Sequence, residues 1–345
     1  MTKERNQFVD IIRGIAMLLV VLGHTMTGCT TGAENSFLFN IVWSLQMPLF
    51  ILISGYVTRY SRGIENGTGL WKYVKRRTIA YLLPWAVWSF IVRGIIFGQS
   101  NFLNIKWLLW HMDSGYWFLT TIWMISLIFG VSTFLAKKIA KESTNKQKLI
   151  TLIFYLAGMA VLAGIGLLAG LSFLAIKLTL YYMPFYFAGY LYGQYRDKIL
   201  ETKWGESTID IIIACCAAGW LFIMTRYHLY ALPDNGFAIV LRALSSITGC
   251  VAVCGLCKGV FSETTKTLVG GVFLNWCGVH SLEIYLTHYL LLSLLKTTEA
   301  PTTGSIQGIA LMFANYLITV VLTVLVVKLA NTSRTLKSVL YGNKG

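Results

Sequence analysis

Apolar segments long enough to cross a bilayer alternate with short polar stretches along all 345 residues of this chain. We place ten of them, at 8–26, 37–58, 78–97, 115–136, 149–168, 171–193, 207–227, 237–257, 279–295 and 306–330. A membrane-spanning helix needs about 20 mostly apolar residues. An open segment in lipid can satisfy its backbone only as a helix. The pattern therefore predicts an all-α polytopic membrane protein with about ten transmembrane helices.

The composition agrees with this pattern, because 56% of the residues are hydrophobic and only 12% are charged. Soluble domains carry about 25% charged residues. We find no internal repeat, low-complexity stretch or soluble segment, so we expect one membrane-embedded domain over 1–345 and no appended soluble domain. Asp10 and Arg13 interrupt the first apolar segment, which argues against a cleaved signal peptide.

The formal net charge of +15 is distributed unevenly between the two sides of the predicted bundle. Lys and Arg gather at the N-terminus, in the connections 59–77, 137–148, 194–206 and 258–278, and in the C-terminal tail. The alternate connections carry only Lys106 and Lys296. Since cytoplasmic loops are enriched in Lys and Arg, we expect both termini to be cytoplasmic in a multi-pass protein of the cytoplasmic membrane. The charge thus reports topology and does not indicate nucleic-acid binding.

The first apolar segment contains two ionisable residues, Arg13 and His24. Such groups are costly in a bilayer and are usually functional or paired. A spacing of eleven residues puts both on one helix face, about 16 Å apart. Asp10, one turn before Arg13, can neutralise it. This face suits a site that holds an anionic ligand near one surface and moves a proton deeper in. The alternative is an Asp10–Arg13 pair that anchors helix packing and a histidine that is merely hydrogen-bonded.

The ninth apolar segment carries a polar stripe made of Ser281, Tyr285 and His288. Their spacing of i, i+4 and i+7 places them on one helix face. A polar stripe on a membrane helix must face protein or water. Glu283 flanks this face, where it could pair with a cation or orient an imidazole.

Polar and aromatic residues elsewhere have two interpretations each. Ser54 follows the kink expected at Pro48 and either allows close helix contact or contacts substrate. Tyr116 and Trp117 begin the fourth segment, as interface anchors or as the lining of a site for a sugar ring or an acyl chain. We read Cys254-x-x-Cys257 as helix packing and predict no metal site.

Four cations lie toward the outer ends of predicted spans: Arg93, Lys177, Arg226 and Arg242. They either snorkel to the headgroups or line an outward cavity for an anionic or sugar-bearing acceptor.

These motifs together resemble the integral-membrane acyltransferase family 3, which includes many bacterial glycan O-acetyltransferases. The resemblance covers nearly the whole chain and rests on four motifs: Asp10-x-x-Arg13-Gly14 with Arg13-x10-His24, Met47-Pro48-Leu49-Phe50 to Ser54-Gly55-Tyr56, Trp117-Phe118-Leu119, and Ser281-x3-Tyr285-x2-His288. It implies a ten-helix fold that passes acyl groups from cytoplasmic acyl-CoA to an acceptor hydroxyl, with Arg13 and His24 as the essential pair. One departure is that many members carry Arg-x-x-Arg before the third helix, whereas here Ala80 stands three residues after Arg77.

The resemblance also implies how the donor is held. The phosphates of acyl-CoA would meet Lys75, Arg76 and Arg77, because cations at a membrane surface suit phosphates. Arg13 would draw the pyrophosphate or the pantetheine arm inward. His24 would then act as general base on the acceptor hydroxyl or accept the acyl group as an acyl-histidine.

Supporting roles follow for the ninth segment. His288 or Tyr285 would donate a hydrogen bond to the tetrahedral oxyanion, and Glu283 would fix an imidazole tautomer. Candidate acceptor contacts are Ser54, Tyr116, Trp117, Arg93 and Arg242. We expect no permanently bound cofactor; acyl-CoA, with acetyl as the expected group, is a co-substrate.

Three questions stay open at this point. The acceptor is a cell-envelope glycan or a lipid-linked sugar of unspecified identity. A transporter or flippase of a lipid-linked glycan, or a structural or sensory subunit, would also carry polar residues in its helices. The oligomeric state is not encoded in any pattern that we recognise.

Overall fold

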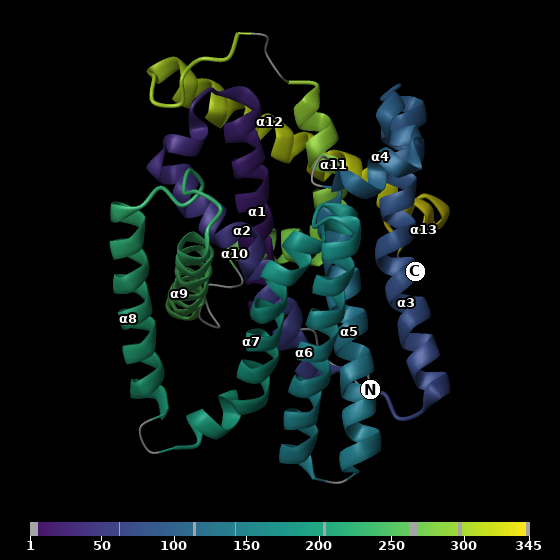
Figure 1. Ribbon diagram of the computed structural model, residues 1–345. Coiled ribbons are helices and arrows are strands. Elements are labelled where there is room, and N and C mark those ends of the chain that lie inside the picture. The colour runs from purple at the N-terminus through teal and green to yellow at the C-terminus, as the bar shows by residue number, and fades with distance from the viewer. Residues whose placement is uncertain are drawn as a thin grey trace. The chain divides into compact units, whose positions relative to one another are not determined.

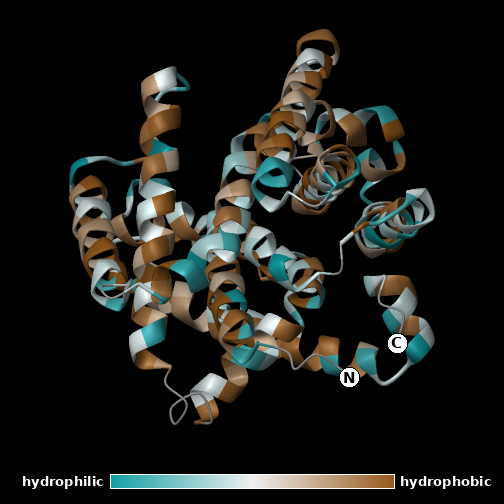
Figure 2. Ribbon diagram, turned by 90° about the horizontal axis from the view of Figure 1, so that it is seen from below, coloured by the Kyte–Doolittle hydropathy of each residue, from teal (hydrophilic) through white to brown (hydrophobic). Residues whose placement is uncertain are grey.

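The computed structural model describes residues 6–61, 63–112, 115–141, 143–202, 205–261, 268–295 and 299–342. Lys3, Arg5 and Lys296, which contribute to the charge pattern, lie outside these ranges. Within them the chain is helical, and its only extended pairing is an isolated bridge between Thr31 and Thr302. Hydrophobic residues dominate most of the helices, and hydrophilic residues occur in short stretches (Figure 2). The all-α membrane fold is therefore confirmed.

Eight of the helices described are long and apolar enough to cross a membrane. They are α1 (Gln7–Cys29), α2 with the 3-10 turn η2 (Phe37–Tyr56 and Val57–Tyr60), α3 with the π-helix η3 (Gly67–Ala86 and Val87–Ile96), α5 (Trp117–Ala140), α6 (Thr144–Ala169), α8 (Gly205–Arg226), α9 (Gly236–Val260) and α12 (Ile306–Asn331) (Figure 1). The other α-helices are α4 (Ile105–Trp110), α7 (Ile176–Leu200), α10 (Val269–Val279), α11 (Ser281–Ser293) and α13 (Arg334–Tyr341), and the short 3-10 turns are η1 (Ala33–Asn35), η4 (Ser100–Leu103) and η6 (Phe173–Ala175).

Two of the ten expected spans differ from this set. The sixth corresponds to α7, which is less apolar because its last turns carry Arg196, Asp197 and Lys198. The ninth, expected at 279–295, corresponds to α11, which is only 13 residues long. The expected connection 258–278 is wrong over its last ten residues, because α10 begins at Val269, and His280 separates α10 from α11.

The expected connection 59–77 is wrong over its second half, because α3 begins at Gly67. Asn66 caps this helix, with its side-chain oxygen accepting from the backbone N–H of Gly69 at 2.8 Å. An asparagine at this position satisfies one of the unpaired donors of a helix start. Lys75, Arg76 and Arg77 therefore lie on a helix and not in a loop.

The chain divides into two compact units, and the first comprises Met1–Tyr56 and Ala188–Leu329. Its central element is α1, which packs against α2, α10 and α11 (Figure 1). Of the residues in the apolar stretch of α1, 61% are buried, against 17% for α8. The ionisable residues of α1 thus lie inside protein, whereas α8 keeps most of its apolar surface exposed.

The contact between α1 and α10 brings the two backbones together. A Cβ atom on Gly278 would overlap the carbonyl oxygen of Asp10, and one on Gly14 would overlap that of Leu274. Small residues allow membrane helices to approach this closely. Since α10 is held against α1 and the chain breaks at His280, α11 also packs on α1.

The second unit comprises Val57–Phe187 and Ala330–Gly345. In it α3 packs on α5, α5 packs on α6, and α13 packs on α3 and η3. Trp88 of η3 donates from its indole nitrogen to the carbonyl of Leu340 at 2.8 Å. This bond holds the C-terminal helix to the unit.

Candidate active site

Two imidazoles from different helices meet in the first unit. The ring centroids of His24 on α1 and His288 on α11 are 5.4 Å apart and tilted by 40°. Tyr289 presents an edge to His24 at 5.3 Å, and the ring of Tyr285 lies 6.0 Å from that of His288. His288 is 1% exposed and His24 is half-buried. The structure thus joins the two histidines that the sequence places on separate segments.

The hydrogen bonds of His288 define its neutral form. Its Nδ1 lies 2.9 Å from the carbonyl oxygen of Ile284. A carbonyl can only accept, so Nδ1 carries the proton and Nε2 carries the lone pair. This Nε2 is buried and has no hydrogen-bond partner in the part of the chain that the structure describes. His288 is therefore arranged to accept a proton or a hydrogen bond.

The expected Asp10–Arg13 pair forms on the first turns of α1. An Nη1 atom of Arg13 lies 3.6 Å from Oδ1 of Asp10. The Asp10 side chain is 3% exposed, whereas the Arg13 side chain is 24% exposed. The carboxylate is thus held inside the protein, and the guanidinium retains a surface that a ligand can reach. Helix geometry separates this cation from His24 by about 16 Å.

Glu283 lies beside a third imidazole. Its Oε1 is 3.6 Å from Nδ1 of His280, at the break between α10 and α11. The carboxyl group is 2% exposed. The imidazole near Glu283 in this arrangement is thus that of His280, at a distance longer than a hydrogen bond, and the orienting role expected for Glu283 stays a prediction.

Two candidate acceptor contacts of the first unit are bonded within the protein. Ser54 donates its hydroxyl to the carbonyl of Phe50, one turn back on α2, at 2.8 Å. Arg242 donates to the carbonyl of Leu229 and the carboxylate of Asp234, both at 2.9 Å, and also to the carbonyl of Leu232. Its guanidinium ties α9 to the connection that precedes it.

The basic residues proposed to hold phosphates lie on α3 of the second unit. Lys75 and Arg76 are exposed, whereas Arg77 is half-buried among tyrosines. Arg77 donates to the hydroxyl of Tyr81 at 3.3 Å, and its guanidinium lies 5.2 Å from the centre of the Tyr73 ring. Lys75 and Arg76 are thus open to solvent, and Arg77 is partly shielded from it.

The remaining candidates of the second unit are packed against neighbours. Arg93 donates to the side chain of Gln99 at 2.8 Å and lies over the ring of Phe102. Tyr116 is 2% exposed, with its ring edge-on to that of Trp88, 6.1 Å away. Trp117 stacks on Tyr182 with centroids 5.7 Å apart.

Sequence reasoning missed two residues beside the imidazole pair. Tyr289 lies four residues after Tyr285, so the helical period that selected the polar stripe could have included it. Gln46 of α2 has a buried Oε1 with no hydrogen-bond partner among the residues described, and this atom faces Gly23, next to His24. Its position at the start of the Gln46-Met47-Pro48 motif was the available signal.

A family model described as an acyltransferase domain, of acyltransferase family 3, matches residues 6–328. The chain belongs to this family. Membership of this family favours the enzyme hypothesis over the transporter and the sensory subunit. The match starts before Arg13 and ends beyond His288, so it contains both ends of the site.

Two curated relatives are both named nodulation protein NolL. That of Sinorhizobium fredii is 22% identical over 63% of this chain and 57% of its own length. That of Mesorhizobium japonicum is 25% identical over 64% of this chain and 57% of its own length. The acyltransferase thus spans little more than half the length of these relatives. No solved structure matches it significantly.

Proposed function

We propose that this acyltransferase moves an acyl group, expected to be acetyl, from cytoplasmic acyl-CoA to a hydroxyl of a cell-envelope glycan or lipid-linked sugar. The observation that carries the proposal is the pair of His24 on α1 and His288 on α11, in which the Nε2 of His288 has no partner among the described residues. The helix of His24 also bears the partly exposed Arg13. We place the protein in the cytoplasmic membrane, with both termini cytoplasmic because of the distribution of Lys and Arg.

Cations with exposed surface suit the phosphates of the donor. Arg13 is oriented by the buried carboxylate of Asp10 and keeps exposed surface for an anion. On α3, Lys75 and Arg76 are exposed and Arg77 is half-buried. Guanidinium groups bind phosphates through charge-assisted hydrogen bonds. Arg13 then directs the arm of the donor toward His24.

His24 removes the proton from the acceptor hydroxyl as the oxygen attacks the thioester carbonyl. The new C–O bond forms, the C–S bond breaks, and the imidazolium of His24 returns the proton to the departing CoA thiolate. A transient acyl-histidine is the second route, in which His24 attacks first and the acceptor hydroxyl follows.

His288 acts as a positioning residue for His24. Its Nε2 accepts from the ring N–H of His24 through one water molecule, so the other nitrogen of His24 is basic. The neutral His288 has no second N–H for an oxyanion, because its only proton lies toward Ile284. Of the two donors expected for the oxyanion, we therefore retain Tyr285.

The proposal is tested with membranes that contain equal amounts of the wild type and His24→Ala, given acetyl-CoA labelled on the acetyl group. Label in extracted envelope glycan and release of free CoA are measured. Loss of a general base lowers transfer by about 100-fold or more. The control is His228→Ala, an exposed histidine of the same unit, which should transfer at the wild-type rate. Equal transfer by His24→Ala would remove His24 from the chemistry, and no CoA release by the wild type would contradict the donor.

A further inference from the structure

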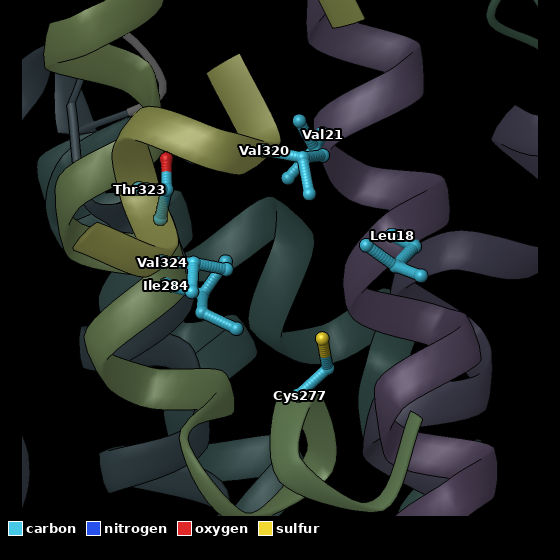
Figure 3. A pocket seen from close by; sticks show the side chains of 7 residues that line it. All are labelled: Leu18, Val21, Cys277, Ile284, Val320, Thr323 and Val324. Atoms are coloured by element: carbon cyan, nitrogen blue, oxygen red, sulfur yellow. The ribbon is translucent and has the colours of Figure 1, made fainter. Parts of the chain in front are cut away.

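A narrow pocket lies between α1, α10, α11 and α12 in the first unit (Figure 3). Val21 of α1 and Ile284 of α11 line it, one helical turn before His24 and His288 respectively. Leu18, one turn farther toward Arg13, and Thr323 of α12 also line it, and the surface that the lining residues present to the space is apolar. The cavity volume of about 10 Å³ is close to what one water molecule needs. Its position is on the route that the donor's arm would follow from Arg13 to His24.

Three side chains on α12 form a buried polar stripe: Asn315, Thr319 and Thr323. They are spaced by four residues, so they share a helix face. Their exposed fractions are 6%, 0% and 1%. Neither the Asn315 amide nitrogen nor either hydroxyl has a hydrogen-bond partner within the residues that the structure describes. Buried polar groups are normally bonded, so three open ones on one face indicate missing partners.

Other buried threonines of this protein behave differently. The hydroxyls of Thr25, Thr151 and Thr179 each donate to the carbonyl four residues back on their own helix, at 2.7–3.1 Å. This bond is available to any threonine inside a helix. Thr319 and Thr323 do not make it, and so their hydroxyls stay available to another molecule.

The polar stripe extends from the level of the imidazoles to the pocket. Met312, one turn before Asn315 on α12, packs in the same buried cluster as Met26 of α1, which is two residues from His24. At the other end, Thr323 shares the pocket with Leu18. The three open polar groups thus follow α1 from the His24 end toward Arg13.

We propose that Asn315, Thr319 and Thr323 bind the amide groups of the thioester donor's flexible arm, with its methylenes against Val21 and Ile284. This inference rests on the proposed function. The arm of acyl-CoA alternates short methylene runs with secondary amides, whose carbonyls accept from Asn315 or a threonine and whose N–H groups donate to a threonine oxygen. A hydrocarbon chain would leave the stripe unsatisfied. A phosphate would need a cation, and none is present among the side chains that line the pocket.

The test measures equilibrium binding of labelled acetyl-CoA to the purified full-length protein in detergent. The variants are Asn315→Leu, Thr319→Val and Thr323→Val, which keep the approximate size and remove the polar group. Adenosine 3′,5′-bisphosphate, which lacks the arm, is the comparison ligand in a competition assay. We expect each variant to weaken acetyl-CoA binding by about three- to tenfold, the value of one hydrogen bond, and to leave the nucleotide unaffected.

Two further variants distinguish a loss of ligand contacts from a loss of folding. Thr151→Val removes a buried threonine hydroxyl from α6 in the second unit and should bind both ligands as the wild type does. Thr323→Ser restores a hydroxyl and should recover acetyl-CoA affinity. Unchanged acetyl-CoA binding in all three stripe variants, or an equal loss for both ligands, would overturn the inference. A wild type that transfers acetyl while the stripe variants bind normally overturns only this inference, whereas a wild type that binds no acetyl-CoA overturns the proposed donor as well.

Discussion

Arg242 and the His24–His288 pair show two different uses of ionisable side chains within one unit of this membrane protein. The guanidinium of Arg242 donates to three oxygens of the connection before α9. His288 instead uses only Nδ1 within its own helix and keeps Nε2 open in a buried position. In a low-dielectric interior an open polar atom is costly. The difference teaches that a polar group such as Arg242, whose hydrogen bonds are made within the protein, stabilises the fold. A buried polar atom without a partner, such as Nε2 of His288, is suited to bind a ligand or a proton.

The largest effect that would sharpen this contrast is expected from His288→Phe, which keeps an aromatic ring and removes Nε2. We expect the turnover rate for acetyl transfer to fall by about 100-fold, because His24 loses the group that fixes its tautomer. The KM for acetyl-CoA and the melting temperature in detergent should stay near wild type. A proportional fall in thermal stability and activity would instead identify His288 as part of the packing.

Arg242→Met should have the opposite signature. Removing a guanidinium that donates to three oxygens should lower the free energy of unfolding by about 2–4 kcal/mol, which is measured as a lower melting temperature. The rate of acetyl transfer per folded molecule should stay close to that of the wild type. Arg226→Met, whose cation lies over Phe222 at the end of α8, is the matched control and should melt like the wild type. A raised KM for the acceptor with normal stability would support the acceptor contact expected from the sequence.

Gly278→Ala should have a smaller effect, and it should lower both stability and acetyl transfer. Its new Cβ meets the carbonyl oxygen of Asp10, so α10 must move from α1 at a cost of about 1–3 kcal/mol. Because α11 follows α10 directly, transfer should fall with stability. Gly270→Ala on the same helix has open space around the new atom and should be neutral. A neutral Gly278→Ala would show that the close contact does not hold the site together.

Tyr289→Phe should have the smallest effect. The edge-on contact of the ring with His24 survives, and only the hydroxyl is lost. We expect transfer to fall by less than about tenfold, the value of one neutral hydrogen bond. Measured with labelled acetyl-CoA, a loss near that of His24→Ala would give this phenol a direct role in the chemistry.

Much of the site on α1 could be predicted from the sequence, since it depends on one helix. The Asp10–Arg13 pair and the common face of Arg13 and His24 follow from the helical period alone. The start of α3 was predicted too late, because its first turns are polar and basic, and the capping bond from Asn66 outweighs that polarity. The helix α10 was also missed, since its 11 residues are too few for an apolar segment of membrane-spanning length.

The sequence by itself determined that the chain forms membrane helices and that a cation and an imidazole share one of them, because both features depend on local periodicity and hydrophobicity. Only the tertiary structure decided that His24 lies against His288, 264 residues away along the chain. That meeting depends on the backbone contact of Gly14 and Gly278 and on the turn at His280, which are non-local. Only the tertiary structure also shows which polar atoms of His288 and α12 lack a hydrogen-bond partner among the described residues, because such partners come from neighbours in space.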